Sequence, residues 1–206
     1  MVDPLTLLAF IPAALALNLT PGADMTFCLS QGLRSGPRTA IASSAGISAG
    51  SMVHVAIAGV GLGALVGTHP WLFDVIRWIG VGYLLWLAYG ALRHSTAPPE
   101  LRAVPMRAAF WSGLLVNLTN PKVILFVLAF IPQFVVPEAG SILGQFFVYG
   151  AILGLGGFVI NAGVGIFAGG VGRALTESPR ASRMLGYVTG TLFAALALRL
   201  AIMERS

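Results

Sequence analysis

The feature that most constrains this chain is a series of apolar stretches, each long enough to cross a lipid bilayer. A transmembrane helix needs about 20 apolar residues, and these runs are too long for the alternating ~10-residue strands of a membrane barrel. Only 9% of the residues are charged, against about 25% in soluble domains. The sequence therefore predicts an all-α membrane protein with six transmembrane helices. The predicted spans are residues 4–31, 40–66, 76–92, 109–135, 142–171 and 184–203.

The arginines predict how the spans are oriented. Loops that carry an excess of Lys and Arg stay in the cytoplasm. The loops after the first, third and fifth spans hold eight arginines, against three on the opposite side. Both termini are therefore expected outside. The eight are Arg34, Arg38, Arg93, Arg102, Arg107, Arg173, Arg180 and Arg183; the three are Arg77, Arg199 and Arg205. Because the basic residues are scattered among apolar runs, nucleic acid is not expected as a partner.

The two halves of the chain repeat one another. Residues 18–21 read Asn-Leu-Thr-Pro and residues 117–121 read Asn-Leu-Thr-Asn-Pro, at matching places in the first and fourth spans. A Gly-Tyr pair also recurs at 82–83 and 186–187, in the third and sixth spans. We predict one domain, 1–206, made of repeat one (1–97), a linker (98–105) and repeat two (106–206). Three spans per repeat place the second repeat upside down, an arrangement typical of transporters.

The prolines of the repeated motif predict a broken helix in each half. Pro21 and Pro121 each remove a backbone N–H donor and force the preceding residue out of the helical region. Thr20 and Asn120 are suited to cap the half-helix that follows. Pro21 lies 13 residues before a predicted cytoplasmic arginine and Pro121 lies 14 residues after one. Both breaks are therefore expected near the bilayer midplane, where such transporters bind substrate.

Two charged residues accompany these breaks. Asp24 lies one turn after Pro21, and Lys122 follows Pro121. Each costs about 2.5–3.5 kcal/mol at the centre of a membrane helix, so the simplest expectation is a direct pair. Such a pair either stabilises the bundle or brackets a zwitterion, with Lys122 and the half-helix N-termini on the carboxylate and Asp24 on the ammonium group or a proton.

Other polar residues of these spans complete the predicted site. His54, in the second span, is either a structural residue or a second proton carrier. The predicted substrate-binding residues are Asn18, Thr20, Pro21, Gly22, Asp24, Asn117, Asn120, Pro121 and Lys122, and the predicted proton-coupling residues are Asp24 and His54. No cofactor and no metal site are expected.

Several short motifs resemble the LysE/RhtB family of amino-acid exporters along the whole chain. They are Thr-Pro-Gly at 20–22, Gly-Leu-Arg-Ser-Gly at 32–36, His54, the segment 80–93, Asn-Pro-Lys at 120–122 and Pro-Gln-Phe at 132–134. Ala23 departs from the family, which usually repeats proline there. The resemblance implies gradient-driven export of a small amino acid or related metabolite across the prokaryotic cytoplasmic membrane. It leaves the substrate, the coupling ion and the oligomeric state open.

Three other functions predict different sequence features. A metal-ion or cation exporter predicts more acidic, His or thiol ligands than Asp24, His54 and Cys28 supply. An enzyme predicts a motif such as HExxH, and the chain has none. A structural subunit that does not transport would not need the inverted repeat or the charges within its spans. The sequence therefore favours a transporter, with a small amino acid and membrane lipid as its partners.

Overall fold

The computed structural model describes residues 2–66 and 105–168, together with isolated residues between 75 and 89 and between 180 and 201. The predicted third and sixth spans fall mostly outside the described residues, as do seven of the predicted orienting arginines and most of the linker. In the described ranges every regular element is a helix. The α-helices are α1 (Pro4–Leu19), α2 (Ala23–Ser35), α3 (Pro37–Val66), α5 (Met106–Leu118), α6 (Pro121–Ala129) and α7 (Ile142–Ile166). Two short 3₁₀ helices, η1 (Ile131–Phe134) and η2 (Pro137–Ala139), join α6 to α7.

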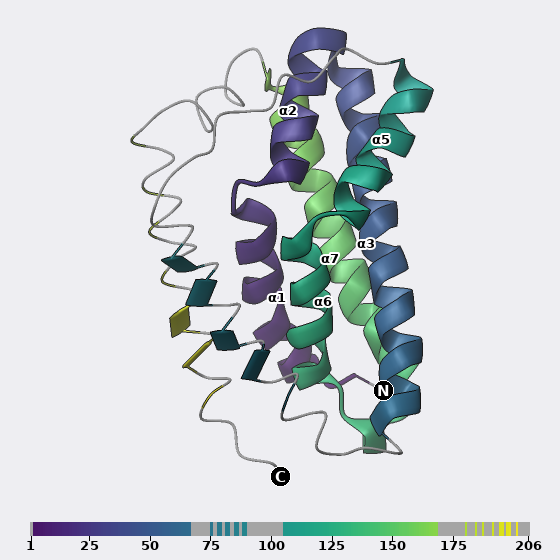
Figure 1. The fold of residues 1–206 in the computed structure, drawn as a ribbon, viewed down its shortest axis with the longest axis vertical. Helices are drawn as coiled ribbons and strands as arrows, with labels where there is room; N and C mark the ends of the chain where they lie inside the picture. The colour runs from purple at the N-terminus through teal and green to yellow at the C-terminus, as the bar shows by residue number, and fades with distance from the viewer. Residues whose placement is uncertain are drawn as a thin grey trace.

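The helices run lengthwise in a bundle, and corresponding spans of the two halves point in opposite directions. In Figure 1, α1 rises into α2 and α3 returns down the bundle, whereas α5 descends into α6 and α7 climbs back. The axis bends by 54° between α1 and α2 and by 56° between α5 and the segment from Pro121 to Phe134. The predicted all-α class, the broken spans and the inversion are therefore confirmed for this part of the chain.

The ends of the helices follow from local sequence signals. Asp3 caps α1 by accepting a hydrogen bond from the Thr6 amide at 3.0 Å, and Ser141 caps α7 through the Gly144 amide at 3.1 Å. Between α2 and α3 the chain reverses at Gly36, whose φ of 86° favours glycine. Pro37 then occupies the first position of α3, where its missing N–H costs nothing.

Glycines allow the long helices to approach at backbone distance. A side chain on Gly46 of α3 would collide with the Phe110 carbonyl of α5, and one on Gly113 of α5 would collide with the Ser43 carbonyl of α3. Gly32 of α2 lies in the same way against Gly165 of α7. Small residues are the usual basis of helix packing in lipid, where burial of apolar surface between helices gives little driving force.

Below the breaks, the interior is filled by aromatic rings instead. Phe10 of α1 packs against Phe126, Phe130, Phe134 and Tyr149, with ring centroids 4.8–6.4 Å apart. The Tyr149 hydroxyl donates to the Phe134 carbonyl at 2.8 Å. This aromatic cluster packs α1 against α6, η1 and α7.

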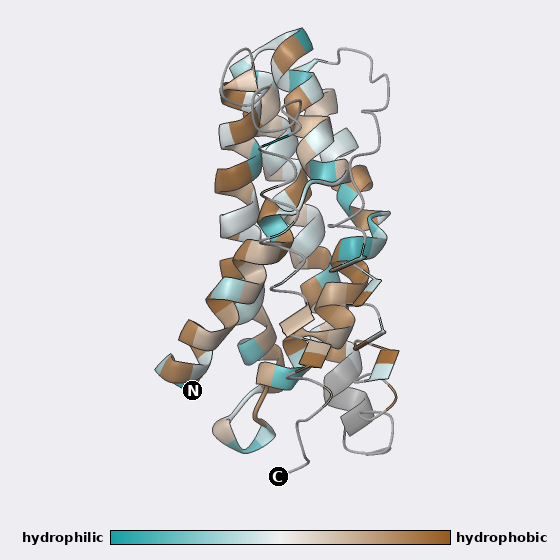
Figure 2. Cartoon of the chain, turned by 90° about the vertical axis from the view of Figure 1, so that its left-hand side faces the viewer, coloured by the Kyte–Doolittle hydropathy of each residue, from teal (hydrophilic) through white to brown (hydrophobic). Residues whose placement is uncertain are grey.

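Large apolar side chains cover much of the outer surface. Leu5, Ile57, Val60, Leu155 and Val159 are each 63–75% exposed. Figure 2 shows hydrophobic residues along most of the length of the helices. The straight helices α3 and α7 contain segments long and apolar enough to cross a bilayer, and each bent pair qualifies when counted as one span. An apolar surface of this extent faces lipid.

Candidate functional site

The first break lies between α1 and α2. Thr20, which precedes Pro21, has extended backbone angles, and its hydroxyl donates back to the Ala16 carbonyl at 2.6 Å. Thr20 therefore ends α1 and does not cap α2, contrary to the sequence-based expectation. The cap of α2 is Gly22, which has no side chain to bond the helix N-terminus. Thr20 is too far from α2 to cap it because Gly22 is itself extended, so the new helix begins two residues after Pro21.

The second break is built differently. Asn120 caps α6 as predicted, since its side-chain oxygen accepts from the Lys122 amide at 3.0 Å. Pro121 takes the first helical position. Both Pro21 and Pro121 are exposed, so these two prolines shape the breaks without lining the interior. One half-helix thus begins with a side-chain cap, and the other begins with bare backbone.

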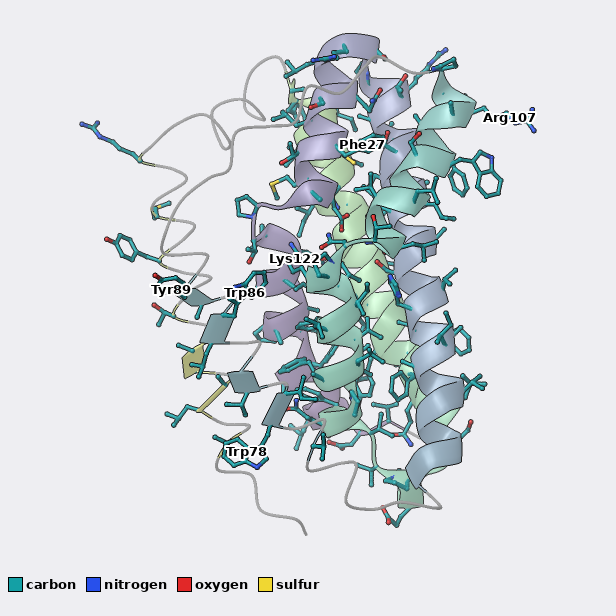
Figure 3. The ribbon with its side chains drawn as sticks, viewed as in Figure 1. Phe27, Trp78, Trp86, Tyr89, Arg107 and Lys122 are labelled. Carbon is teal, nitrogen blue, oxygen red and sulfur yellow. The ribbon has the colours of Figure 1, made fainter. Side chains whose placement is uncertain are left out.

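Lys122 crosses from the second break to the first. Its ammonium donates to the carbonyls of Leu17, at 3.0 Å, and Thr20, at 2.9 Å. These belong to the last turn of α1, whose carbonyls have no partner within the helix and carry the negative end of the helix dipole. A Cβ on Gly22 would lie 3.3 Å from the same ammonium. Figure 3 shows Lys122 at middle height, where α6 meets α1.

Asp24 lies in the first turn of α2 and is only 8% exposed. One of its carboxylate oxygens accepts from the Asn117 side-chain amide at 3.0 Å. The direct pair with Lys122 expected from the sequence does not form, because each charge has a different partner. The unsatisfied carbonyls that end α1 attract the ammonium, and the amide at the end of α5 attracts the carboxylate.

Asn117 joins the two residues predicted to carry protons. Its side chain is fully buried, and the Ser51 hydroxyl donates to its oxygen at 3.3 Å. The backbone carbonyl of Asn117 lies 3.3 Å from His54 Nε2. Gly50 allows this approach, since a Cβ there would be 2.8 Å from the Asn117 oxygen. Asp24 of α2 and His54 of α3 therefore both contact Asn117 of α5.

Asn18 is the counterpart of Asn117 in the first half. It donates to the Leu153 carbonyl of α7 at 3.0 Å and lies against Gly156 and Gly157. Each repeated asparagine therefore contacts the glycine-rich span of the other half: Asn18 reaches α7, and Asn117 reaches α3. These two contacts hold the two repeats together at the level of the breaks.

A small cavity lies between the two breaks. Its volume is about 10 Å³, room for roughly one water molecule. Of the predicted site residues, Asn18, Thr20, Asp24 and Lys122 line it, whereas Pro21, Gly22, His54, Asn117, Asn120 and Pro121 do not. Ser48, Ser51 and Asn161 also line the cavity, although none of them is among the predicted substrate-binding residues. The spacing of Ser44, Ser48 and Ser51, three and four residues apart, is a polar stripe that could have revealed the serines.

The exposed charges within residues 2–66 and 105–168 lie at the two ends of the bundle. Exposed Arg34 and Arg38 flank the turn between α2 and α3, and Arg107 begins α5 at the same end (Figure 3). Asp3 and Glu138 are exposed at the opposite end. Arg34, Arg38 and Arg107 belong to the set predicted to be cytoplasmic.

Apolar helices, two matched breaks and a small cavity lined in part by charged and polar residues define this chain as a polytopic α-helical membrane protein. The family model described as LysE type translocator matches residues 15–204. The chain belongs to this family, as its motifs suggested.

Curated relatives match over nearly the whole chain. A homoserine/homoserine lactone efflux protein of Salmonella typhimurium is 31% identical over 90% of both chains. A leucine efflux protein of Klebsiella pneumoniae is 29% identical over 97% of this chain and 96% of its own. An uncharacterized membrane protein of Vibrio cholerae is 31% identical over 94% of this chain and 95% of its own. No solved structure matches.

Proposed function

We propose that the chain is a secondary active exporter of small amino acids across the prokaryotic cytoplasmic membrane. The observation that carries the proposal is the cavity between the breaks, which has one carboxylate and one ammonium in its wall. A zwitterion presents the complementary pair of charges. The names of two relatives, which specify homoserine and leucine efflux, support this class of substrate.

The proposed roles of the two charges follow from their bonds. An ammonium has three N–H donors, and Lys122 uses two of them on the end of α1. The third is assigned to the substrate carboxylate, together with the uncapped N-terminus of α2. Asp24 receives the ammonium group or a proton. The remaining predicted site residues shape the breaks, as Pro21, Gly22 and Pro121 do, or hold the charged groups in place, as Asn117 and Asn120 do.

Proton coupling is proposed at Asp24, with His54 as a second carrier. A carboxylate that holds either an ammonium or a proton couples the two fluxes by exclusion, since the protonated form binds the amine poorly. The contacts of Asn117 with both residues support their action as a unit. The arginine-bearing end is assigned to the cytoplasm, with both termini outside.

The test is leucine transport in proteoliposomes whose cytoplasmic face points outward. An acidic lumen should drive uptake of labelled leucine by the wild type. Asp24→Asn should lower this gradient-driven uptake more than a hundredfold, because the amide cannot carry the proton. It should retain measurable leucine binding, because its shape is unchanged.

Glu138→Gln is the matched control, because it removes an exposed carboxylate far from the cavity and should transport normally. Gradient-driven uptake by a well-folded Asp24→Asn protein at the wild-type rate would refute the coupling role. Failure of the wild type to bind or exchange any of the common amino acids would refute amino-acid export itself.

A further inference from the structure

Two hydrogen-bond acceptors in the wall of the cavity have no protein partner. They are Asp24 Oδ1 and Asn161 Oδ1, both buried and both without a hydrogen bond in the part of the chain that the structure describes. Their residues are only 8% and 4% exposed. A buried acceptor without a partner costs about 1–3 kcal/mol. Two in the wall of one small cavity indicate a ligand that supplies donors.

The two oxygens come from different helices that meet at the cavity. Asp24 is in the first turn of α2, and the next residue, Met25, packs against Val164 and Ile160 of α7. Asn161 lies on α7 one turn beyond Gly157, which also lines the cavity. Residues four apart share a helix face, so α7 presents first a bare glycine and then the Asn161 amide to this cavity.

Neighbouring donors are already used by other groups. The Ser48 hydroxyl donates to the Gly154 carbonyl at 2.9 Å. The Ser51 hydroxyl bonds Ile47 and Asn117, and that of Thr20 bonds Ala16. The wall between Asp24 and Asn161 therefore offers acceptors, one of them negatively charged. A complementary ligand brings several N–H or O–H donors and a positive charge, in a group no larger than a water molecule.

We infer that Asp24 Oδ1 and Asn161 Oδ1 form the subsite for the α-ammonium group of the substrate. This inference rests on the proposed amino-acid export and adds Asn161 as a substrate-binding residue. An ammonium matches the site in charge, in its three donors and in its size, which is close to that of water. A 2-hydroxy acid of the same shape brings one donor and no charge, so the subsite selects for the amine.

The experiment measures this selection directly. Purified wild type and variants in proteoliposomes are tested for binding of leucine and of its analogue 2-hydroxy-4-methylpentanoate. Asn161→Leu keeps the volume but removes the acceptor. It should lower the ratio of leucine affinity to hydroxy-acid affinity about tenfold, the effect of one hydrogen bond to a charged group. Asn161→Asp, which keeps an acceptor, should preserve that preference. Gly163→Ala of α7, whose Cβ would meet nothing within 4 Å, should resemble the wild type.

Other outcomes would overturn the inference in distinguishable ways. Equal weakening of both ligands by Asn161→Leu would show a purely structural residue. Loss of the preference for leucine in Asn161→Asp would show that Asn161 donates instead of accepting. A sodium requirement for leucine binding that disappears in Asn161→Leu would assign the oxygens to a metal cation. In each case the wild type still binds leucine, so amino-acid export stands. If the wild type binds neither leucine nor any other common amino acid, both proposals fail.

Discussion

The two helix breaks have nearly the same backbone bend, 54° and 56°, but very different side chains. The break at Pro21 leaves the carbonyls of Leu17 and Thr20 to be bonded from outside and is followed by Gly22, which has no side chain. The break at Pro121 carries its own cap, Asn120, and a cation, Lys122. Because the lysine of one break bonds the carbonyls of the other, the two are complementary. The inverted repeat thus gives the two breaks a similar backbone bend. Their sequence differences place the cation on the second break and the open carbonyls on the first.

The largest effect is expected from removing the cation that joins the breaks. Lys122→Met should weaken leucine binding about a hundredfold or more, because the end of α1 and the substrate carboxylate both lose a charged donor. Equilibrium binding to the purified variant is the measurement. Lys122→Arg, which keeps the charge, should retain more affinity than Lys122→Met. Equal binding by the wild type and Lys122→Met would show that the lysine is only structural and that the breaks do not cooperate in substrate binding.

An intermediate effect is expected from the repeated asparagines, which are equivalent in sequence but not in surroundings. Asn117→Leu leaves Asp24 buried without its donor and should reduce leucine transport about tenfold or more. Asn18→Leu removes a single bond to the Leu153 carbonyl and should reduce transport only about threefold. Initial rates of counterflow, normalised to folded protein, compare the pair. Larger damage from Asn18→Leu would show that the bond to Leu153 matters more for transport than the bond to Asp24.

The smallest effect is expected at Gly22. A Cβ there would lie 3.3 Å from the Lys122 ammonium, the flexible end of a long side chain. Gly22→Ala should therefore change leucine affinity by about threefold or less, as the ammonium shifts slightly. Gly46→Ala is the contrasting variant, because its Cβ would meet the Phe110 backbone, and we expect it to lower the thermal unfolding temperature instead. A severe binding defect in Gly22→Ala with a normal unfolding temperature would show that the substrate itself contacts Gly22.

The two helix breaks of this site could be predicted from sequence, whereas the hydrogen-bond partners of its side chains on other helices could not. Pro21 and Pro121 act locally, through a missing donor and a steric clash, so their breaks follow from the residues alone. The partners of Lys122 depend on which backbone carbonyls the first break leaves without a hydrogen bond. The sequence does not reveal that Gly22 is extended and delays the start of α2. Asn161 lies within the predicted fifth span. Its place in the cavity depends on the rotation of α7, an apolar, glycine-rich helix without a polar stripe to fix its facing.

The bond between Asp24 and Asn117 has a consequence for how the protein is made. The two residues are 93 positions apart, so most of the first half leaves the ribosome before Asn117 exists. Until α5 arrives, the carboxylate of Asp24 lacks its amide donor, and an unpaired charge in lipid is costly. The hydrogen bonding of the first half is therefore complete only when the second half has arrived.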